Sequence, residues 1–356
     1  MKIFIFGAGA SRDAQHRVVH DNAIPPLTNE LFDQRYSEFA RIVGLLDPAM
    51  STYRNQAAGF GYFEDWLTHE WEKIQTLKTL SSRDAQKGFL AQILFYIWLI
   101  LINASKWTYE NQHQNREDNA YVTLMYKILN LDEEFGLINF NYDLLLDYAY
   151  KDVFRLTFHR VEDYLNNNYV KPHGSVNWLL SKRDDDLVID LDHEHNMDTR
   201  VRLDTAIKLM YRDVPIPMNG LLVKEPNHRD LYTIDDLLRS FSRQYFYPLI
   251  FLPLTSKVYS SIAGFEDAII KKGNQLMSKA TEIYLIGYRA NDSVIKEMLQ
   301  NIQSAQVVLN VVGMKSSAEE IMQRVLGMHK NLRRGKVFDK GFYNYAYDPS
   351  EIVISK

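Results

Sequence analysis

The residues best suited to chemistry begin at the first turn of the chain, where residues 3 to 11 read Ile-Phe-Ile-Phe-Gly-Ala-Gly-Ala-Ser. Four consecutive apolar residues are typical of a strand buried on both faces of a parallel sheet. Gly7 and Gly9 allow the backbone to turn sharply and to approach a ligand closely. A helix beginning near Ser11 would direct its first N–H groups at that turn, which suits a pyrophosphate. The segment predicts a nucleotide site, and most simply a dinucleotide site.

The same turn departs from the full dinucleotide-binding pattern. Arg12 stands where the third glycine of G-x-G-x-x-G would be, and no acidic residue with a clear ribose role follows about 20 residues later. A tight strand-to-helix turn without a ligand is therefore the alternative interpretation.

Two later clusters combine amide, carboxylate and imidazole side chains after short apolar runs. Asn139, Asn141 and Asp143 close one run, and His173 lies in the segment Lys-Pro-His-Gly-Ser over residues 171–175. Each cluster alone has a structural interpretation, because asparagine is common in turns, aspartate is a common helix N-cap, and a single histidine is more often structural than catalytic.

Five apolar runs predict the strands that would position these side chains. They comprise residues 3–6, 137–140, 249–252, 283–286 and 307–312. We expect an α/β protein with a Rossmann-like, mostly parallel sheet and helices on both faces. Several runs end in residues suited to turning or to chemistry, namely Gly7, Asn141, Pro253 and Gly287. Ligands of doubly wound sheets bind at the carboxyl ends of the strands, so function is expected there.

The remaining segments predict additions to one domain over residues 1–356. Helical patterns over 63–80, 89–105 and 121–129, preceded by helical spacing after Thr28, indicate a helical insertion over 28–130. A charged loop or insertion is expected over 181–240, and a tyrosine-rich tail over 338–356 would pack on the core or on a neighbour.

The acidic residues and histidines of residues 181–204 have two interpretations, a metal site and a solvated loop. Their spacing matches no metal-binding motif, and both histidines lie among charged residues, so we favour the loop and expect no metal.

Composition narrows the class of protein. Of 356 residues, 46% are hydrophobic and 13% aromatic, which is enough for a substantial core. A net charge of −4 argues against a broad nucleic-acid-binding surface. The lack of cysteine excludes disulfides, iron–sulfur clusters, thiolate nucleophiles and cysteine-bound zinc, and it suits a cytoplasmic protein.

Neither a signal peptide nor a membrane span is expected. The first apolar residues run directly into the glycine turn, without space for a cleavage site. The most apolar stretch, residues 89–104, is shorter than the ~20 residues that cross a bilayer. It predicts a helix buried in the core or at a subunit interface.

In this order and at these separations, the motifs resemble those of the sirtuin superfamily. The resemblance includes the glycine turn, the segments around Asn141 and His173, Phe-Leu-Pro at 251–253 with Lys257 downstream, and Ile-Gly-Tyr at 286–288 with Asp292. It extends from residue 7 to about residue 312. It is greatest for bacterial sirtuin-like proteins without the zinc module, several of which are anti-phage NAD-consuming enzymes.

The resemblance implies a role for each matching position. Asn141 would position the nicotinamide ribose and the attacking water, His173 would be the general base, and Asp143 would contact the nicotinamide carboxamide. The remaining positions would hold the rest of NAD: Gly7, Ala8, Gly9 and Ser11 the pyrophosphate and adjacent ribose, Gly287 and Tyr288 the adenosine side, and Asn310 the adenosine ribose.

These residue types suit cleavage of the nicotinamide–ribose bond. The transition state is oxocarbenium-like, with positive charge developing on the sugar. Nicotinamide leaves as a neutral molecule, so no strong general acid is required. A neutral amide orients a water or a ribose hydroxyl, and an imidazole accepts the proton, an effect worth ~10²–10⁴ in rate.

Two departures from the deacylating sirtuins favour water as the acceptor. Those enzymes carry a four-cysteine zinc ribbon, and this chain has no cysteine. Their Gly-Ile-Pro-x-Phe-Arg segment is replaced here by Ala-Ile-Pro-Pro-Leu over residues 23–27. We therefore expect an NAD glycohydrolase that releases nicotinamide and ADP-ribose.

Two alternatives stay open, and partners are expected. One is a non-catalytic NAD- or ADP-ribose-binding sensor or scaffold subunit, and the other a protein deacylase or ADP-ribosyltransferase. Continuous NAD hydrolysis would poison a cell, so gating by homo-oligomerisation or by a partner is expected, with residues 89–104 as a candidate assembly surface. The resemblance suggests a partner ATPase of a defence system.

Overall fold

The computed structural model of the chain describes residues 1–15, 23–27, 30–42, 53–56, 59–60, 63–110, 119–180, 216–217, 221–223, 247–250, 262–264 and 266–348. Several expectations from the sequence lie outside these residues. They concern Thr28, the charged residues 181–204, the segment 251–253 with Lys257, and the end of the tail over 349–356.

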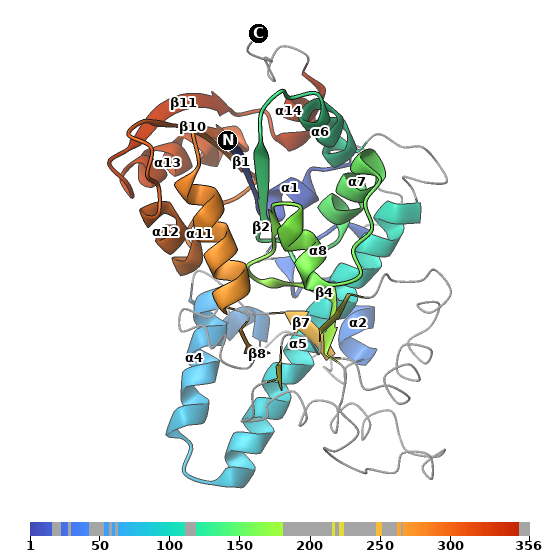
Figure 1. Cartoon of the computed structure of the whole chain (residues 1–356). Helices are drawn as coiled ribbons and strands as arrows, with labels where there is room; N and C mark the ends of the chain where they lie inside the picture. The colour runs from blue at the N-terminus through green and yellow to red at the C-terminus, as the bar shows by residue number, and fades with distance from the viewer. Residues whose placement is uncertain are drawn as a thin grey trace.

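A six-stranded, all-parallel sheet forms the centre of the fold, as predicted (Figure 1). Its order is β3-β2-β1-β9-β10-β11. The bounds are β1 (Lys2–Phe6), β2 (Phe135–Asn139), β3 (Tyr169–Val170), β9 (Glu282–Ile286), β10 (Val307–Val312) and β11 (Leu332–Phe338). Four of the six correspond to apolar runs in the sequence.

β1 is a central strand because both of its faces are apolar. All five of its residues are buried, and it pairs with β2 on one side and β9 on the other. The chain leaves β1 toward β2 and returns later to β9, so the strand order reverses between β1 and β9. Such a reversal is the topological switch point at which doubly wound sheets bind ligands.

The described part of the apolar run 249–252, residues 249 and 250, does not belong to the parallel sheet, which corrects the expectation from the sequence. Residues Tyr247–Ile250 form β7, which pairs antiparallel with β4 (Gly174–Leu180) in a separate sheet of order β6-β4-β7. A four-residue apolar run fits either kind of strand, so its pattern alone does not assign it to a sheet.

Three short strands complete the described β-structure. β6 (Leu221–Val223) is an edge of the three-stranded sheet, and β5 (Ile216–Pro217) pairs parallel with β8 (Ile262–Ala263). In Figure 1 the N-terminus lies at the amino end of β1, near the top of the parallel sheet. The three-stranded sheet β6-β4-β7, which we call the small sheet, lies below it, beyond the carboxyl ends of the parallel strands.

Helices pack around the parallel sheet. In Figure 1, α11 to α13 lie to the left of the sheet, and α6, α7 and α14 lie to the upper right. α6 packs against both α7 and α14. The bounds are α1 (Ala8–Arg12), α6 (Ala120–Leu129), α7 (Leu145–Phe154), α8 (Val161–Asn166), a π-helical turn η8 (Glu266–Ile270), α11 (Lys271–Ser278), α12 (Ser293–Gln300), α13 (Lys315–Leu326) and α14 (Phe342–Tyr347).

The described part of the tail packs on the core. Phe342 and Tyr345 of α14 are buried, and Phe342 contacts the rings of Phe6 and Tyr121. The C-terminal segment through α14 therefore covers one side of the strand that leads into the glycine turn.

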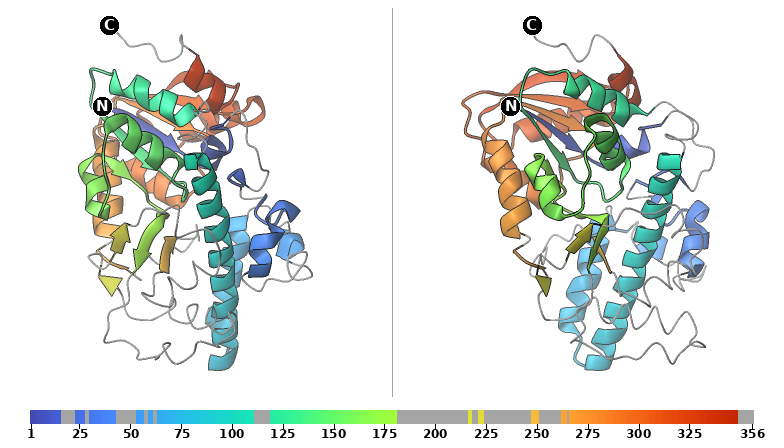
Figure 2. Two further views of the ribbon diagram at one scale, coloured as in Figure 1. Left: turned by 90° about the vertical axis from the view of Figure 1, so that its right-hand side faces the viewer. Right: turned by 45° about the vertical axis from the view of Figure 1, so that its right-hand side comes forward.

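Between β1 and β2 the chain adds helices that extend beyond the sheet (Figure 2). A 3₁₀ turn η3 (Gln34–Tyr36) and α2 (Ser37–Ile42) precede the antiparallel pair α4 (Phe63–Thr76) and α5 (Leu80–Glu110). No helix among the described residues is both long enough and apolar enough to cross a membrane.

The apolar centre of α5 is buried within the chain, which argues against its candidate role as an assembly surface. Residues 96–102 are each at most 7% exposed. Trp98 donates a hydrogen bond to the backbone oxygen of Val176 in β4, at 2.9 Å. Of the two interpretations that the sequence allowed, core packing is the one observed for these residues.

Candidate functional site

The carboxyl ends of β1, β2 and β9 bring three loops together at the switch point. The glycine turn follows β1, residues 140–143 follow β2, and residues 287–292 follow β9. Pairing places Phe6 opposite both Asn139 and Ile286, so the three loops begin at the same level of the sheet.

The glycine turn packs against the loop after β9. The N–H of Gly7 donates to Ile286 O at 3.1 Å, and that of Gly9 donates to Gly287 O at 2.9 Å. A Cβ on Gly7 would lie 2.5 Å from Cδ2 of Tyr288, and one on Gly9 would lie 2.9 Å from Gly287 O. Both glycines are therefore required by contact between two loops. Close approach of these glycines to a ligand, which the sequence predicts, stays a prediction.

Gly287 is the third glycine of this contact. Its φ of +57° is in the left-handed region, and a Cβ there would overlap the backbone nitrogen of Ala10. Short α1 thus begins directly against the β9 loop, with Ala8 as its first residue.

Ser11, Asn141 and Tyr121 form a buried hydrogen-bond network beside the glycine turn. Nδ2 of Asn141 donates to Gly7 O at 3.0 Å and to Ser11 Oγ at 2.9 Å, and it lies 3.4 Å from the Tyr121 hydroxyl. Ser11 Oγ and the Tyr121 hydroxyl are 3.0 Å apart. The glycine turn and the Asn141 amide, which is predicted to be catalytic, therefore lie together. Oδ1 of Asn141 is the atom that can accept a hydrogen bond from a hydroxyl or a water.

Asp143 continues this network. Its carboxylate accepts a hydrogen bond from Leu145 N at 3.1 Å, near the start of α7. Burial raises the pKa of the Asp143 carboxyl above its usual value, while the Lys171 ammonium and the Ser11 hydrogen bond act in the opposite direction. Burial also raises the pKa of Tyr121 well above its usual value, so that hydroxyl stays protonated at neutral pH.

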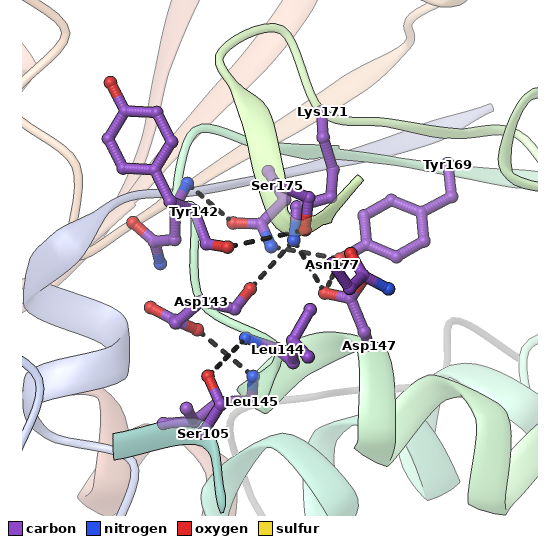
Figure 3. Close-up of polar contacts among 12 residues, drawn as sticks. Ser105, Tyr142, Asp143, Leu144, Leu145, Asp147, Tyr169, Lys171, Ser175 and Asn177 are labelled. Carbon is purple, nitrogen blue, oxygen red and sulfur yellow. Dashed lines mark hydrogen bonds and ion pairs between the residues drawn. The ribbon is translucent and has the colours of Figure 1, made fainter. Parts of the chain in front are cut away.

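A second polar cluster, drawn to the right in Figure 3, fixes the turn that carries Asn141 and Asp143. Lys171 Nζ donates to the backbone oxygen of Asp143 at 2.8 Å and to Oδ2 of Asp147 at 2.9 Å. The Asp147 carboxylate also accepts from the hydroxyls of Tyr164 and Tyr169, each at 2.8 Å.

α5 and β4 also contact this turn, with Ser105 of α5 below it and Ser175 of β4 above it in Figure 3. Leu144 N donates to the buried hydroxyl of Ser105 on α5 at 3.0 Å. Val176 N of β4 donates to Tyr142 O at 3.0 Å. The helical insertion and the small sheet therefore both help to position the residues after β2.

His173 lies against the residues that flank Asn141. Its ring is edge-on to Phe140 at a centroid distance of 4.9 Å and lies 5.7 Å from the ring of Tyr142. Phe140 stacks in turn on Tyr288, at 4.5 Å. The imidazole Nε2 lies 2.7 Å from Oδ2 of Asp292, in the loop after β9. The imidazole, the turn after β2 and the loop after β9 thus meet at one edge of the sheet.

Asn310 lies apart from this group. It occupies the middle of β10, where its Nδ2 donates to Glu282 at 2.8 Å and its Oδ1 accepts from Lys336 N at 2.8 Å. Glu282 is the first residue of β9, so Asn310 is bonded to a residue at the amino end of that strand. Asn310 is therefore not at the end of its strand, where the sequence predicts it, but at an irregularity in the pairing of β10 with β11.

Four residues of the site region received no role from the sequence: Tyr121, Asp147, Lys171 and Asp292. Asp147 follows Asp143 by four residues, and Lys171 precedes His173 by two. Their proximity to the predicted motifs is therefore a signal that could have identified both residues. Asp292 belongs to a segment that the resemblance includes, but its contact with His173 has no local signal, and neither has the contact of Tyr121 with Asn141, because both contacts form only in the tertiary fold.

No group of three or more His, Cys, Asp or Glu side chains that could hold a metal ion occurs within the described ranges. Comparison with known proteins adds no assignment: no protein-family model matches the chain, and no curated protein matches it significantly.

Proposed function

We propose that this chain is an NAD glycohydrolase of sirtuin-like type, which cleaves NAD to nicotinamide and ADP-ribose. The observation that supports the proposal is that Asn141, bonded to Gly7 and Ser11, lies between Phe140 and Tyr142, whose rings both contact His173. This arrangement occurs at the switch point of a Rossmann-like sheet, where such folds bind nucleotides.

The reaction adds water across the N-glycosidic bond. The bond electrons go to the nicotinamide ring nitrogen, which neutralises its charge, and the water oxygen bonds to the anomeric carbon. His173 takes the proton that the water releases. Asn141 uses its amide hydrogens within the chain, so its Oδ1 orients the water or the ribose hydroxyl.

Buried neighbours support this role by limiting the movement of the reacting groups. Asn141, Asp143 and His173 are each at most 5% exposed. The hydrogen bonds of Ser11 and Tyr121 fix the amide, and the Lys171–Asp147 pair fixes the backbone of Asp143. A site of this kind binds its reactants in one geometry and excludes bulk water.

The glycine turn acts in this proposal through close packing. Gly7, Gly9 and Gly287 let two loops touch, and this contact holds Ser11 and Asn141 in place. Asp143 would contact the nicotinamide carboxamide, and Gly287 and Tyr288 would line the adenosine side.

The cellular role that we propose is NAD depletion in anti-phage defence. The enzyme would act in the cytoplasm, which the lack of cysteine suits, as a homo-oligomer or together with a partner ATPase. These assignments rest on the sirtuin resemblance of the motifs.

The direct test is nicotinamide release from NAD by the purified protein, followed by chromatography. Asn141→Ala and His173→Ala should each lower the rate at least ~10²-fold. The matched controls are Asn301→Ala and His159→Ala, whose side chains lie away from the site and which should retain the wild-type rate. Full activity of both site variants would overturn the proposal. Stable NAD binding without turnover, also with the partner present, would favour the sensor alternative.

A further inference from the structure

His173 and Asp292 are 119 positions apart in the sequence, yet they form a close polar pair. Nε2 lies 2.7 Å from Oδ2, and the side chains keep only 6% and 9% of their accessible surface. Charge-assisted hydrogen bonds of this length gain strength when water is excluded. The pair therefore constrains the imidazole more firmly than a surface contact would.

Asp292 is itself held by the helix that it begins. It is the N-cap of α12, and its Oδ1 accepts from Val294 N at 2.6 Å. One carboxylate oxygen thus caps the helix while the other faces His173. Because the cap fixes the rotamer of Asp292, the position of the second oxygen is set by the backbone of α12.

We propose that Asp292 is a positioning residue that fixes the orientation and the tautomer of His173. A carboxylate only accepts hydrogen bonds, so the neutral imidazole carries its hydrogen on Nε2 and its lone pair on Nδ1. Phe140 and Tyr142 pack against the ring and limit its rotation. The same carboxylate stabilises the imidazolium that forms when the base takes a proton.

This inference rests on the proposed function for its catalytic consequence, and its structural part can be tested separately. Asp292→Asn keeps the size and the N-capping ability of the side chain. Its amide nitrogen would donate to Nε2, which moves the imidazole hydrogen to Nδ1. Asp292→Ser keeps a cap but removes the partner of the ring. Neither variant should unfold the protein, because serine, asparagine and aspartate are comparable N-caps.

The experiment compares the full-length wild type with both variants in two measurements. The first is kcat and KM for NAD cleavage. The second is ¹⁵N NMR of ring-labelled histidine, with the His173 signals assigned by their loss in His173→Gln. The matched control is Asp33→Asn, which alters the N-cap of the 3₁₀ turn η3 instead of α12.

We expect Asp292→Asn to lower kcat roughly 10²-fold or more, with a change in KM of only a few-fold. The wild-type spectrum should show the hydrogen on Nε2, and that of Asp292→Asn should show it on Nδ1. Asp292→Ser should lower kcat by less, and Asp33→Asn should match the wild type in both measurements.

An unchanged tautomer in Asp292→Asn would overturn the inference, and so would an unchanged or raised kcat. A raised kcat would mean that the pair holds His173 in an inactive arrangement. If the wild type leaves NAD intact, the proposed function fails, and the NMR measurement alone decides whether Asp292 fixes the imidazole.

Discussion

Lys171 and Asp147 form an ion pair of 2.9 Å from which water is almost wholly excluded, with exposures of 0% and 2%. The lysine also donates to the backbone oxygen of Asp143, and the aspartate accepts from Tyr164 and Tyr169. A buried pair is favourable only when further hydrogen bonds compensate for desolvation, and here they do. The pair links α7 to the segment that precedes β4.

Replacing Lys171 by methionine should therefore destabilise the protein strongly. The substitution leaves the Asp147 carboxylate buried without its cation, which should lower the free energy of unfolding by roughly 3–5 kcal/mol. Urea denaturation measures this effect. Adding Asp147→Leu to Lys171→Met should recover part of the loss, because no unpaired charge then remains.

The exposed pair Arg334–Glu319 provides the control. Glu319→Gln should leave the denaturation midpoint nearly unchanged, since solvent screens such pairs. Equal effects of Lys171→Met and Glu319→Gln would contradict the argument from burial.

Asp143→Asn should stabilise the protein at neutral pH. Burial raises the pKa of the native Asp143 carboxyl above its usual 3.8, so the charged form opposes folding. The penalty is absent below pH 3.8, grows as the pH rises toward the raised pKa, and is constant above it. The stability difference between variant and wild type should follow this curve in denaturation series at several pH values. A variant that is less stable at pH 7 would show that the Lys171 charge outweighs desolvation.

Tyr121→Phe should isolate the contribution of one hydroxyl to the network. The ring keeps its contacts with Phe6 and Phe342, while Ser11 and Asn141 lose a hydrogen-bond partner. We expect a loss of stability of about 1 kcal/mol and a reduced kcat for NAD cleavage with little change in KM.

Tyr126→Phe is the matched control for Tyr121→Phe, because Tyr126 lies on the same helix and is 55% exposed. It should change neither stability nor kcat measurably. If the two variants behave alike, the Tyr121 hydroxyl does not support Asn141.

Gly287→Ala should show what the contact between the two loops contributes to stability. A Cβ at Gly287 costs about 1 kcal/mol for its positive φ and roughly 1–3 kcal/mol more for overlap with Ala10. Gly264 separates these two costs, because its φ is +81° and no atom of the described residues lies within 4 Å of its Cβ position. Gly264→Ala should therefore incur only the first cost. Thermal unfolding of both variants makes the comparison, and equal costs would mean that the loops adjust freely.

Apolar runs predicted the inner strands of the sheet because those strands are buried on both faces. β11 reads Leu-Arg-Arg-Gly-Lys-Val-Phe, and it lies at the edge of the sheet, where its charged side chains reach solvent. β11 therefore lacks the continuous run of apolar residues that predicts β1. β7 includes part of an apolar run but pairs with β4 in the small sheet. An apolar run predicts a buried strand, but it does not predict which strand will be its neighbour.

The sequence predicts candidate site residues where they directly follow a strand. It does not predict the residues that contact them from a distant part of the chain. Asn141 and His173 stand beside recognisable segments. Tyr121 and Asp292 reach them from α6 and from the N-cap of α12, and no spacing in the sequence encodes those contacts. Gly7 and Gly9 also lie in close contact with the loop after β9, which the sequence did not predict, and their approach to a ligand stays a prediction.

β1 pairs with β2 and β9, and the residues of the site extend from Gly7 to Asp292. During translation, an emerging chain therefore holds its first loop long before it holds the last partner. A ribosome-bound fragment that stops short of α12 lacks the carboxylate beside His173. The arrangement around His173 therefore forms only after the loop that follows β9 has been synthesised.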